Sequence, residues 1–144
     1  MNGLRYVPEI NGVEYGWANV AAMIGTSPIT GIKKISYKDE QEMENIYGAG
    51  LQPVARGYGK IKSSASITLL RSDVESIRRS SPTGRLQDIA PFDIVVQYVP
   101  VQGQLPVRHT VKNAQFKNDS VEMGEGETSN QTTFELIVSH IQWQ

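Results

Sequence analysis

The amino-acid sequence predicts a mainly β protein, a β-sandwich or small barrel of about seven strands with one short α-helix. Three observations carry this prediction. Several runs alternate apolar and polar residues at a period of two, as strands with one buried and one solvated face do. Turn-forming Gly, Pro, Asn and Asp separate these runs. One segment, residues 71–81, has the spacing and charge order of a helix.

Length and composition indicate one globular domain, residues 1–144, which is large enough to bury a core. The formal net charge of −1 gives no sign of a polyelectrolyte. A general nucleic-acid-binding protein would need clustered Lys and Arg, and the longest cationic clusters here are Lys33-Lys34 and Arg78-Arg79. The absence of cysteine excludes disulfides and thiolate chemistry. No apolar run approaches the roughly 20 residues of a membrane span, and residues 1–10 lack the features of a secretory signal. We therefore expect no membrane anchor and synthesis in the cytosol.

The N-terminal part is expected to form a hairpin of residues 5–10 and 13–22 about Asn11-Gly12. Asn-Gly supplies the two positive φ angles of a type I′ turn. Further strands are expected over residues 92–99, 107–116 and 132–143. The last of these has apolar residues on both faces and is therefore expected to be covered on both sides.

The expected helix, residues 71–81, follows the central strands. Ser72 is its candidate N-cap, with Glu75 at the capping-box spacing. Arg78 and Arg79 fall in the last turn, where the helix dipole favours cations. A single short helix packed on a sheet follows from this pattern.

Residues 32–38 and 61–70 alternate so that one face consists almost entirely of Lys, Ser and Thr. Such a face suits an exposed sheet, and it equally suits the wall of a water-filled channel. Its residues are Lys34, Ser36, Lys38, Lys62, Ser64, Ser66 and Thr68.

The segment between these two runs, residues 39–60, is expected to be a long inter-strand loop that opens with acidic residues and closes with several glycines. A loop of roughly 20 residues is uncommon in a compact domain and is usually functional or disordered. Disorder fits poorly, because the segment carries large apolar side chains that are costly to leave in water. We expect another copy of the chain to cover it, through Asp39, Glu42, Glu44, Tyr47, Leu51, Val54, Arg56 and Tyr58.

The sequence shows no constellation for catalysis, a cofactor or a metal. His109 and His140 lie in expected strands without the spacing of metal ligands, and are interpreted as surface or interface residues. No Gly-x-Ser-x-Gly elbow is present, the glycines of residues 48–59 lack a phosphate-loop context, and the acidic run of residues 39–44 lacks a calcium-loop pattern. We expect no enzyme.

The order of motifs resembles bacteriophage tail tube proteins, including those of contractile tails and type VI secretion systems. The matching motifs are, in order, Ile-x-Tyr-x-Asp (residues 35–39), an acidic run, Tyr47-Gly48, Pro53, and Gly57 and Gly59 before a Ser/Thr-rich strand. A short helix follows, then a strand led by Phe92, the corner of residues 115–118, an acidic turn and a strand that ends near Trp143. The resemblance runs from about Val13 onward.

The resemblance implies a structural subunit of a phage tail tube or related contractile injection tube. Six copies would form a ring whose inner sheets join into one barrel, and stacked rings would form a conduit for DNA or effectors. The implied partners are sheath, baseplate and tail terminator proteins, with DNA passing non-specifically. The implied location is the virion, assembled in the host bacterial cytoplasm. The loop of residues 39–60 would lie against a neighbouring subunit or ring.

The Lys/Ser/Thr face would line the lumen, together with Glu122 of the acidic turn. Tube lumens are expected to favour negative charge, and the lysines of this face depart from that expectation. Either the acidic residues around Glu122 balance them, or the assignment of the face is inverted.

Two alternatives remain open. One is a single-ring relative of the same fold: a secreted type VI ring protein, a tube initiator or a hub. Electron microscopy separates the two, because long tubes indicate a tube subunit and lone rings indicate the relative. The other is a monomeric β-barrel that binds a small ligand, which predicts a concave apolar interior and a short central loop.

Overall fold

A computed structural model describes residues 8–15, 18–24, 27–29, 31–100, 104–119 and 131–144. In these residues ten strands form one continuous mixed sheet, accompanied by one α-helix and one 3-10 turn. The strands are β1 Glu9–Ile10, β2 Val13–Glu14, β3 Ala18–Ile24, β4 Ser27–Ile29, β5 Lys34–Tyr47, β6 Pro53–Leu70, β7 Phe92–Tyr98, β8 Val107–Phe116, β9 Gln131–Ile137 and β10 His140–Gln142. The helix α1 spans Arg71–Arg79 and the 3-10 turn η1 spans Leu86–Asp88. The mainly β prediction with one short helix is confirmed. The described sheet is open, with more strands than predicted, and it does not close into a barrel within one chain.

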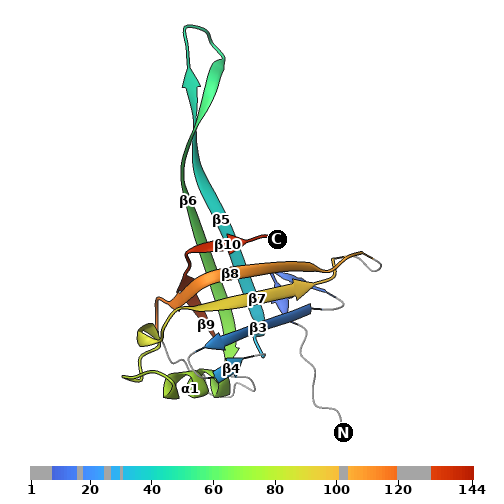
Figure 1. Ribbon diagram of the computed structural model, residues 1–144, viewed down its shortest axis with the longest axis vertical. Coiled ribbons are helices and arrows are strands. Elements are labelled where there is room, and N and C mark those ends of the chain that lie inside the picture. The colour runs from blue at the N-terminus through green and yellow to red at the C-terminus, as the bar shows by residue number, and fades with distance from the viewer. Residues whose placement is uncertain (1–7, 16–17, 25–26, 30, 101–103, 120–130) are drawn as a thin grey trace.

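The sheet folds into two layers that enclose the core. One layer contains β2, β1, β5, β6 and β9, and the other contains β4, β3, β7, β8 and β10. The end of β8 joins them, since Gln115 and Phe116 pair with Ile137 and Leu136 of β9. In Figure 1, β5 and β6 run along the long axis while β3, β7 and β8 cross it. The space between the layers is filled by apolar side chains, of which Phe134 is fully buried.

The hairpin at Asn11-Gly12 is confirmed, with φ of 52° and 82° at its two turn residues. The Asn11 side chain also accepts a hydrogen bond from the Tyr37 backbone N–H at 2.9 Å, which ties the turn to β5. The second strand of the hairpin was predicted too long. In the structure β2 ends at Glu14, and β3 lies in the other layer, where it pairs with β7.

The predicted loop of residues 39–60 is wrong. β5 and β6 remain paired through it and leave only residues 48–52 as a turn. From residue 39 to residue 63 each strand pairs only with the other within the described chain, and we call this part the arm. Figure 1 shows the arm projecting from the two-layer body. In the arm, apolar and polar residues do not alternate regularly, because neither face is covered by a second layer. The sequence of this part therefore lacks the pattern that predicts a strand.

A β-bulge near the base of the arm changes which side chains share a face. Gln41 pairs with Ile61, but the next pair is Met43 with Tyr58, so β6 carries one extra residue. Gly59 lies at this bulge, and a Cβ atom on it would approach the Glu42 side chain to 3.0 Å. A glycine suits a bulge where backbones approach this closely. Since a shift of one residue reverses the faces, the bulge brings Tyr58 to the same face as Ile61.

The helix α1 begins directly after β6 and confirms the predicted segment, with Val74 and Ile77 buried beneath it. The predicted N-cap is wrong. Leu70 occupies the cap position with no side-chain cap, and Ser72 lies inside the first turn.

The last predicted strand is divided. β9 ends at Ile137 and β10 begins at His140, where it pairs with β8 of the other layer. Ile137 is 57% exposed, so the expected cover on both sides is also wrong.

Candidate assembly surfaces

One face of the arm continues the core-facing side of the body. On β5 and β6 this side begins with Ile35, Tyr37, Ala65 and Ile67, all of them buried. Beyond the body the same side carries four large apolar residues, which we call the apolar strip: Ile61, Met43, Tyr58 and Tyr47. Their exposed fractions are 61%, 56%, 66% and 61%. The core-facing side of the body therefore continues along the arm, where no second layer packs against it.

The apolar strip is uncovered because the second layer ends at the base of the arm. The last residue that covers this side is Trp143, just after β10. Its Nε1–H donates a hydrogen bond to Asp39 Oδ2 at 2.8 Å, and its ring lies 5.6 Å from the ring of Tyr37. Past Asp39 the residues of this side are exposed.

Beneath Trp143, an aromatic cluster fills the base. His109 Nδ1 lies 2.6 Å from the Tyr37 hydroxyl, and its ring meets those of Tyr98 and Trp143 edge to face. Burial raises the pKa of Tyr37 and lowers that of His109, so it favours the neutral form of both side chains. The interpretation of His109 as a surface or interface residue is wrong in this chain, because it is buried.

Trp143→Phe is expected to destabilise the protein by about 1 kcal/mol, because it removes one hydrogen bond and keeps the aromatic ring. Asp39→Asn keeps an acceptor oxygen for the indole N–H, so a smaller loss is expected. Urea unfolding of the two variants and the wild type measures both. Equal stability of Trp143→Phe and wild type would show that the bond to Asp39 does not hold the C-terminal residues to the arm.

The eight residues predicted as an oligomer interface all lie on the arm, and all are exposed. Alternation along β5 places Asp39 and Tyr47 on one face and Glu42 and Glu44 on the other, so the eight residues do not share one face of the arm. Leu51, at the tip, is 98% exposed. Arg56 donates a hydrogen bond to the Asn45 side chain across the hairpin at 3.3 Å. The predicted set omits Ile61, which the sequence placed on the buried side and which is exposed because it lies beyond the second layer.

The opposite face of β5 and β6 is polar, as predicted, and we call it the polar face. Its residues are cross-strand neighbours, with Lys34 opposite Thr68, Ser36 opposite Ser66 and Lys38 opposite Ser64. Ser66 is half-buried and the others are exposed, apart from Thr68. Thr68 is buried between Lys34 and Thr133, with its Oγ1 2.8 Å from that of Thr133, so its assignment as an exposed lumenal residue is wrong in the single chain. Glu122 lies outside the described residues.

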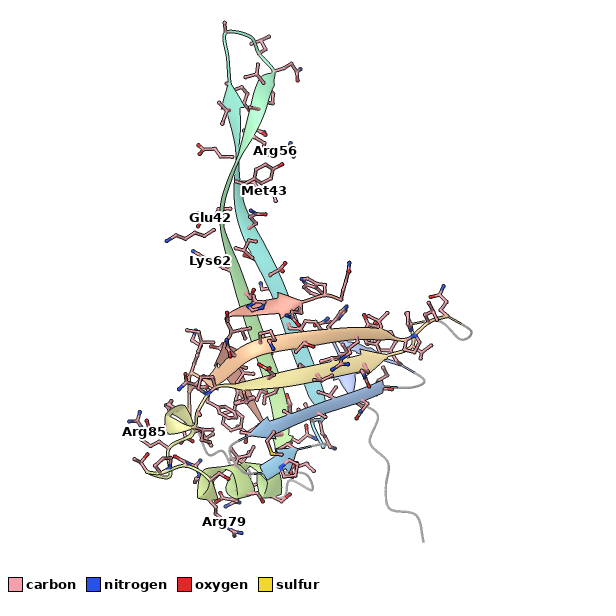
Figure 2. All side chains as sticks on the ribbon, in the orientation of Figure 1. Glu42, Met43, Arg56, Lys62, Arg79 and Arg85 are labelled. Carbon is pink, nitrogen blue, oxygen red and sulfur yellow. The ribbon has the colours of Figure 1, made fainter. Side chains whose placement is uncertain are left out.

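Ion pairs run along the polar face. Lys34, Lys38 and Lys62 pair with Glu9, Glu40 and Glu42. The predicted excess of positive charge is therefore balanced by these glutamates. Figure 2 shows Glu42 and Lys62 on the side of the arm away from Met43. A shallow hollow of about 580 Å³ opens on the same face. Its polar lining includes Ser36, Lys38, Ser64, Ser66, Lys117 and Glu135.

Among the described residues, no group of three or more His, Cys, Asp or Glu side chains is placed to hold a metal ion. No helix in the described part of the chain has the length and apolar character to span a membrane.

No family model matches the chain, and no curated protein matches it. Several solved structures share its fold, and two of them are described here. A chain of the anti-feeding prophage baseplate, a 6-fold symmetrised cryo-EM structure, is 12% identical with a TM-score of 0.57, over 99% of this chain and 96% of that one. A chain of the PVC sheath–tube complex, an extracellular contractile injection system in its extended state, is 13% identical with a TM-score of 0.60, over 87% of each. The chain has the same fold as these two chains from contractile injection systems.

The fold shared with these two chains confirms the resemblance drawn from the order of motifs. At 12 and 13% identity the similarity is one of fold. It extends over nearly the whole chain, arm included, since one of the alignments covers 99% of it.

Proposed function

We propose that the chain is a structural subunit of a contractile injection assembly, and that it forms hexameric rings which stack into a hollow tube for DNA or effectors. Sheath, baseplate and tail terminator proteins are its proposed partners, and a phage tail or related particle is its proposed location. The observation that carries this proposal is the apolar strip. Residues that continue a buried face and remain more than half exposed are typical of an interaction site.

The free edges of the arm support the same proposal. Along the arm, β5 and β6 each have one edge with no strand beside it in the described chain. Exposed edges invite pairing with another chain, and closing a sheet across subunits removes them. A neighbouring copy would extend this layer into a ring and supply the missing cover for the apolar strip.

The shape of the molecule favours open-ended stacking. The arm and the helix α1 lie at opposite ends of the long axis in Figure 1, and Figure 2 places Arg79 and Arg85 at the helix end. A contact that joins two different surfaces is heterologous, and such contacts generate rings or filaments. The polar face, which needs no apolar cover, would then line the lumen.

The test is mass in solution, by light scattering over a range of concentrations. The wild type is expected to grow in mass with concentration, and a Tyr47→Asp, Leu51→Asp variant is expected to stay a monomer. The matched control places two aspartates at exposed apolar positions off the arm, Met23→Asp and Leu105→Asp, and should assemble as the wild type does. A wild type that remains monomeric at millimolar concentration would contradict the proposal.

A second candidate is a ring at the baseplate end of such an assembly. The similarity to a chain of the anti-feeding prophage baseplate favours it. Electron microscopy of the assembled protein distinguishes the two, because a tube subunit forms long tubes and a baseplate component forms single rings.

A further inference from the structure

The aromatic cluster at the base of the arm encloses a histidine that has no counter-charge. The ring centroid of His109 lies 4.9 to 5.7 Å from those of Trp143, Tyr37 and Tyr98, edge to face in each case. The titratable side chains around it are Tyr37 from β5, Tyr98 from β7, and Tyr15, which stacks on Tyr98. Asp39 bonds to the indole of Trp143, and within the described residues no ion pair joins a carboxylate to His109.

The other strands beside His109 add no charge to this side. β3 contains no charged residue, and β7 places Val96 opposite His109. The charged neighbours of His109 on β8 are Arg108 and Lys112, which alternation turns to the opposite face. His140 of β10 is exposed and pairs with Lys112, so it too belongs to that opposite face. The immediate surroundings of His109 are therefore aromatic or apolar.

Protonation of His109 places a charge where no carboxylate compensates it. In the neutral form, His109 Nδ1 and the Tyr37 hydroxyl share one hydrogen bond of 2.6 Å. The imidazolium ring has two N–H donors, and only one of them lies at the Tyr37 oxygen. Burial lowers the pKa of His109 below its ordinary value of about 6.5. The enclosed state therefore binds a proton less readily than a state in which water reaches the ring, and acidification favours the open state.

One wall of this enclosure can open with the loss of few contacts. It consists of residues 140–143, which we call the cover, and Figure 1 shows it beside the base of the arm. β10 has three residues and pairs only with β8 in the described chain. Trp143 is 42% exposed, although its ring closes one side of the cluster. Segments with few buried contacts open at a low cost in free energy, whereas Tyr37, Tyr98 and His109 lie within longer strands.

We propose that protonation of His109 releases the cover, so that residues 140–143 act as an acid-sensitive lid over the aromatic cluster. Release uncovers the ring of Tyr37, which lies on the same side of β5 as the apolar strip. The exposed apolar side of the arm then extends into the body as the pH falls. This inference goes beyond the proposed function and does not depend on it, because every step takes place within one chain.

The test measures the exposure of Trp143 by acrylamide quenching of its fluorescence. A Trp17→Phe parent protein leaves Trp143 as its one tryptophan. The quenching constant is expected to rise up to about twofold on acidification, because Trp143 is already 42% exposed when the cover is closed. The rise should lie between about pH 7.5 and about pH 5, where carboxylates stay largely ionised. Its midpoint should fall below about pH 6.5 and coincide with the titration of the His109 ring, followed by NMR in the same protein. Far-UV circular dichroism should stay constant, because the body remains folded.

Two variants of the parent protein identify the group responsible. His109→Asn keeps a hydrogen-bonding amide near the position of Nδ1 but takes up no proton, so its quenching should not change over this range. His140→Asn removes the other histidine of the sequence, which lies in the cover itself, and should respond as the parent does. If His109→Asn does not fold, the comparison of quenching with the His109 titration in the parent decides. Constant quenching in the parent, a response retained by His109→Asn, or a response lost in His140→Asn would each overturn the proposal.

Discussion

Replacing residues 44–57 by Asn-Gly is expected to abolish assembly and to leave the body folded. Met43 and Tyr58 are directly opposite each other, so a two-residue type I′ turn closes the shortened hairpin between them. The deleted part contributes nothing to the core, since its large apolar residues, Ile46, Tyr47, Leu51 and Val54, are 50 to 98% exposed. The stability of the body should therefore change by no more than about 0.5 kcal/mol.

Thermal unfolding and electron microscopy of this deletion variant measure the two effects separately. The expected outcome is a melting temperature close to that of the wild type and no tubes or rings at concentrations where the wild type forms them. Tubes formed by the shortened protein would show that the distal arm is not the joint. A body that unfolds would show that the arm belongs to the fold of the single chain.

Asp119→Ala is expected to destabilise the protein by about 2–3 kcal/mol, or roughly 5–10 °C in melting temperature. The Arg78 guanidinium donates two parallel hydrogen bonds to this carboxylate, both 2.8 Å long. The backbone N–H of Leu86 donates a third at 3.3 Å. The side chains of Arg78 and Asp119 are only 25% and 17% exposed. Removing the Asp119 carboxylate therefore leaves the largely buried Arg78 guanidinium and the Leu86 backbone N–H without this hydrogen-bond acceptor.

This ion pair also predicts a pH dependence. The hydrogen bonds from Arg78 lower the pKa of Asp119 below its ordinary value of about 3.9. Its contribution is therefore fully present above that ordinary value and is lost as the pH falls through the lowered pKa. The stability difference between wild type and Asp119→Ala should be constant near neutral pH and shrink below about pH 4. A difference that grows with acidification would contradict the assignment.

The body could be predicted from the sequence because its strands have one buried face. Alternation about Ile35 and Tyr37 gave the correct faces, and the strand over residues 107–116 matches β8 residue for residue. The arm could not be predicted in this way. It has no covered side to enforce alternation, and the face of Tyr58 depends on a bulge at Gly59 whose register the alternation pattern does not fix.

Contacts between segments that are distant in the chain could also not be predicted from the sequence. The buried His109 has its hydrogen-bond partner in Tyr37, which lies 72 residues earlier in the sequence. Asp119 meets Arg78 across 41 residues, although each resembles a solvated charge in its own segment. The apolar content of the arm, by contrast, needed no contact to be noticed. The expectation that its side chains lack cover within the chain agrees with their exposure.

The bulged two-stranded ribbon has a consequence for how growth would begin. A hairpin without a third strand or a packed face is only marginally stable in water. The first copies to meet would therefore lose the conformational entropy of two loosely ordered ribbons at once, whereas a copy that joins an existing end adds only its own. Such a difference produces a slow nucleation step followed by rapid templated elongation, so the ribbon itself would restrict where a new assembly starts.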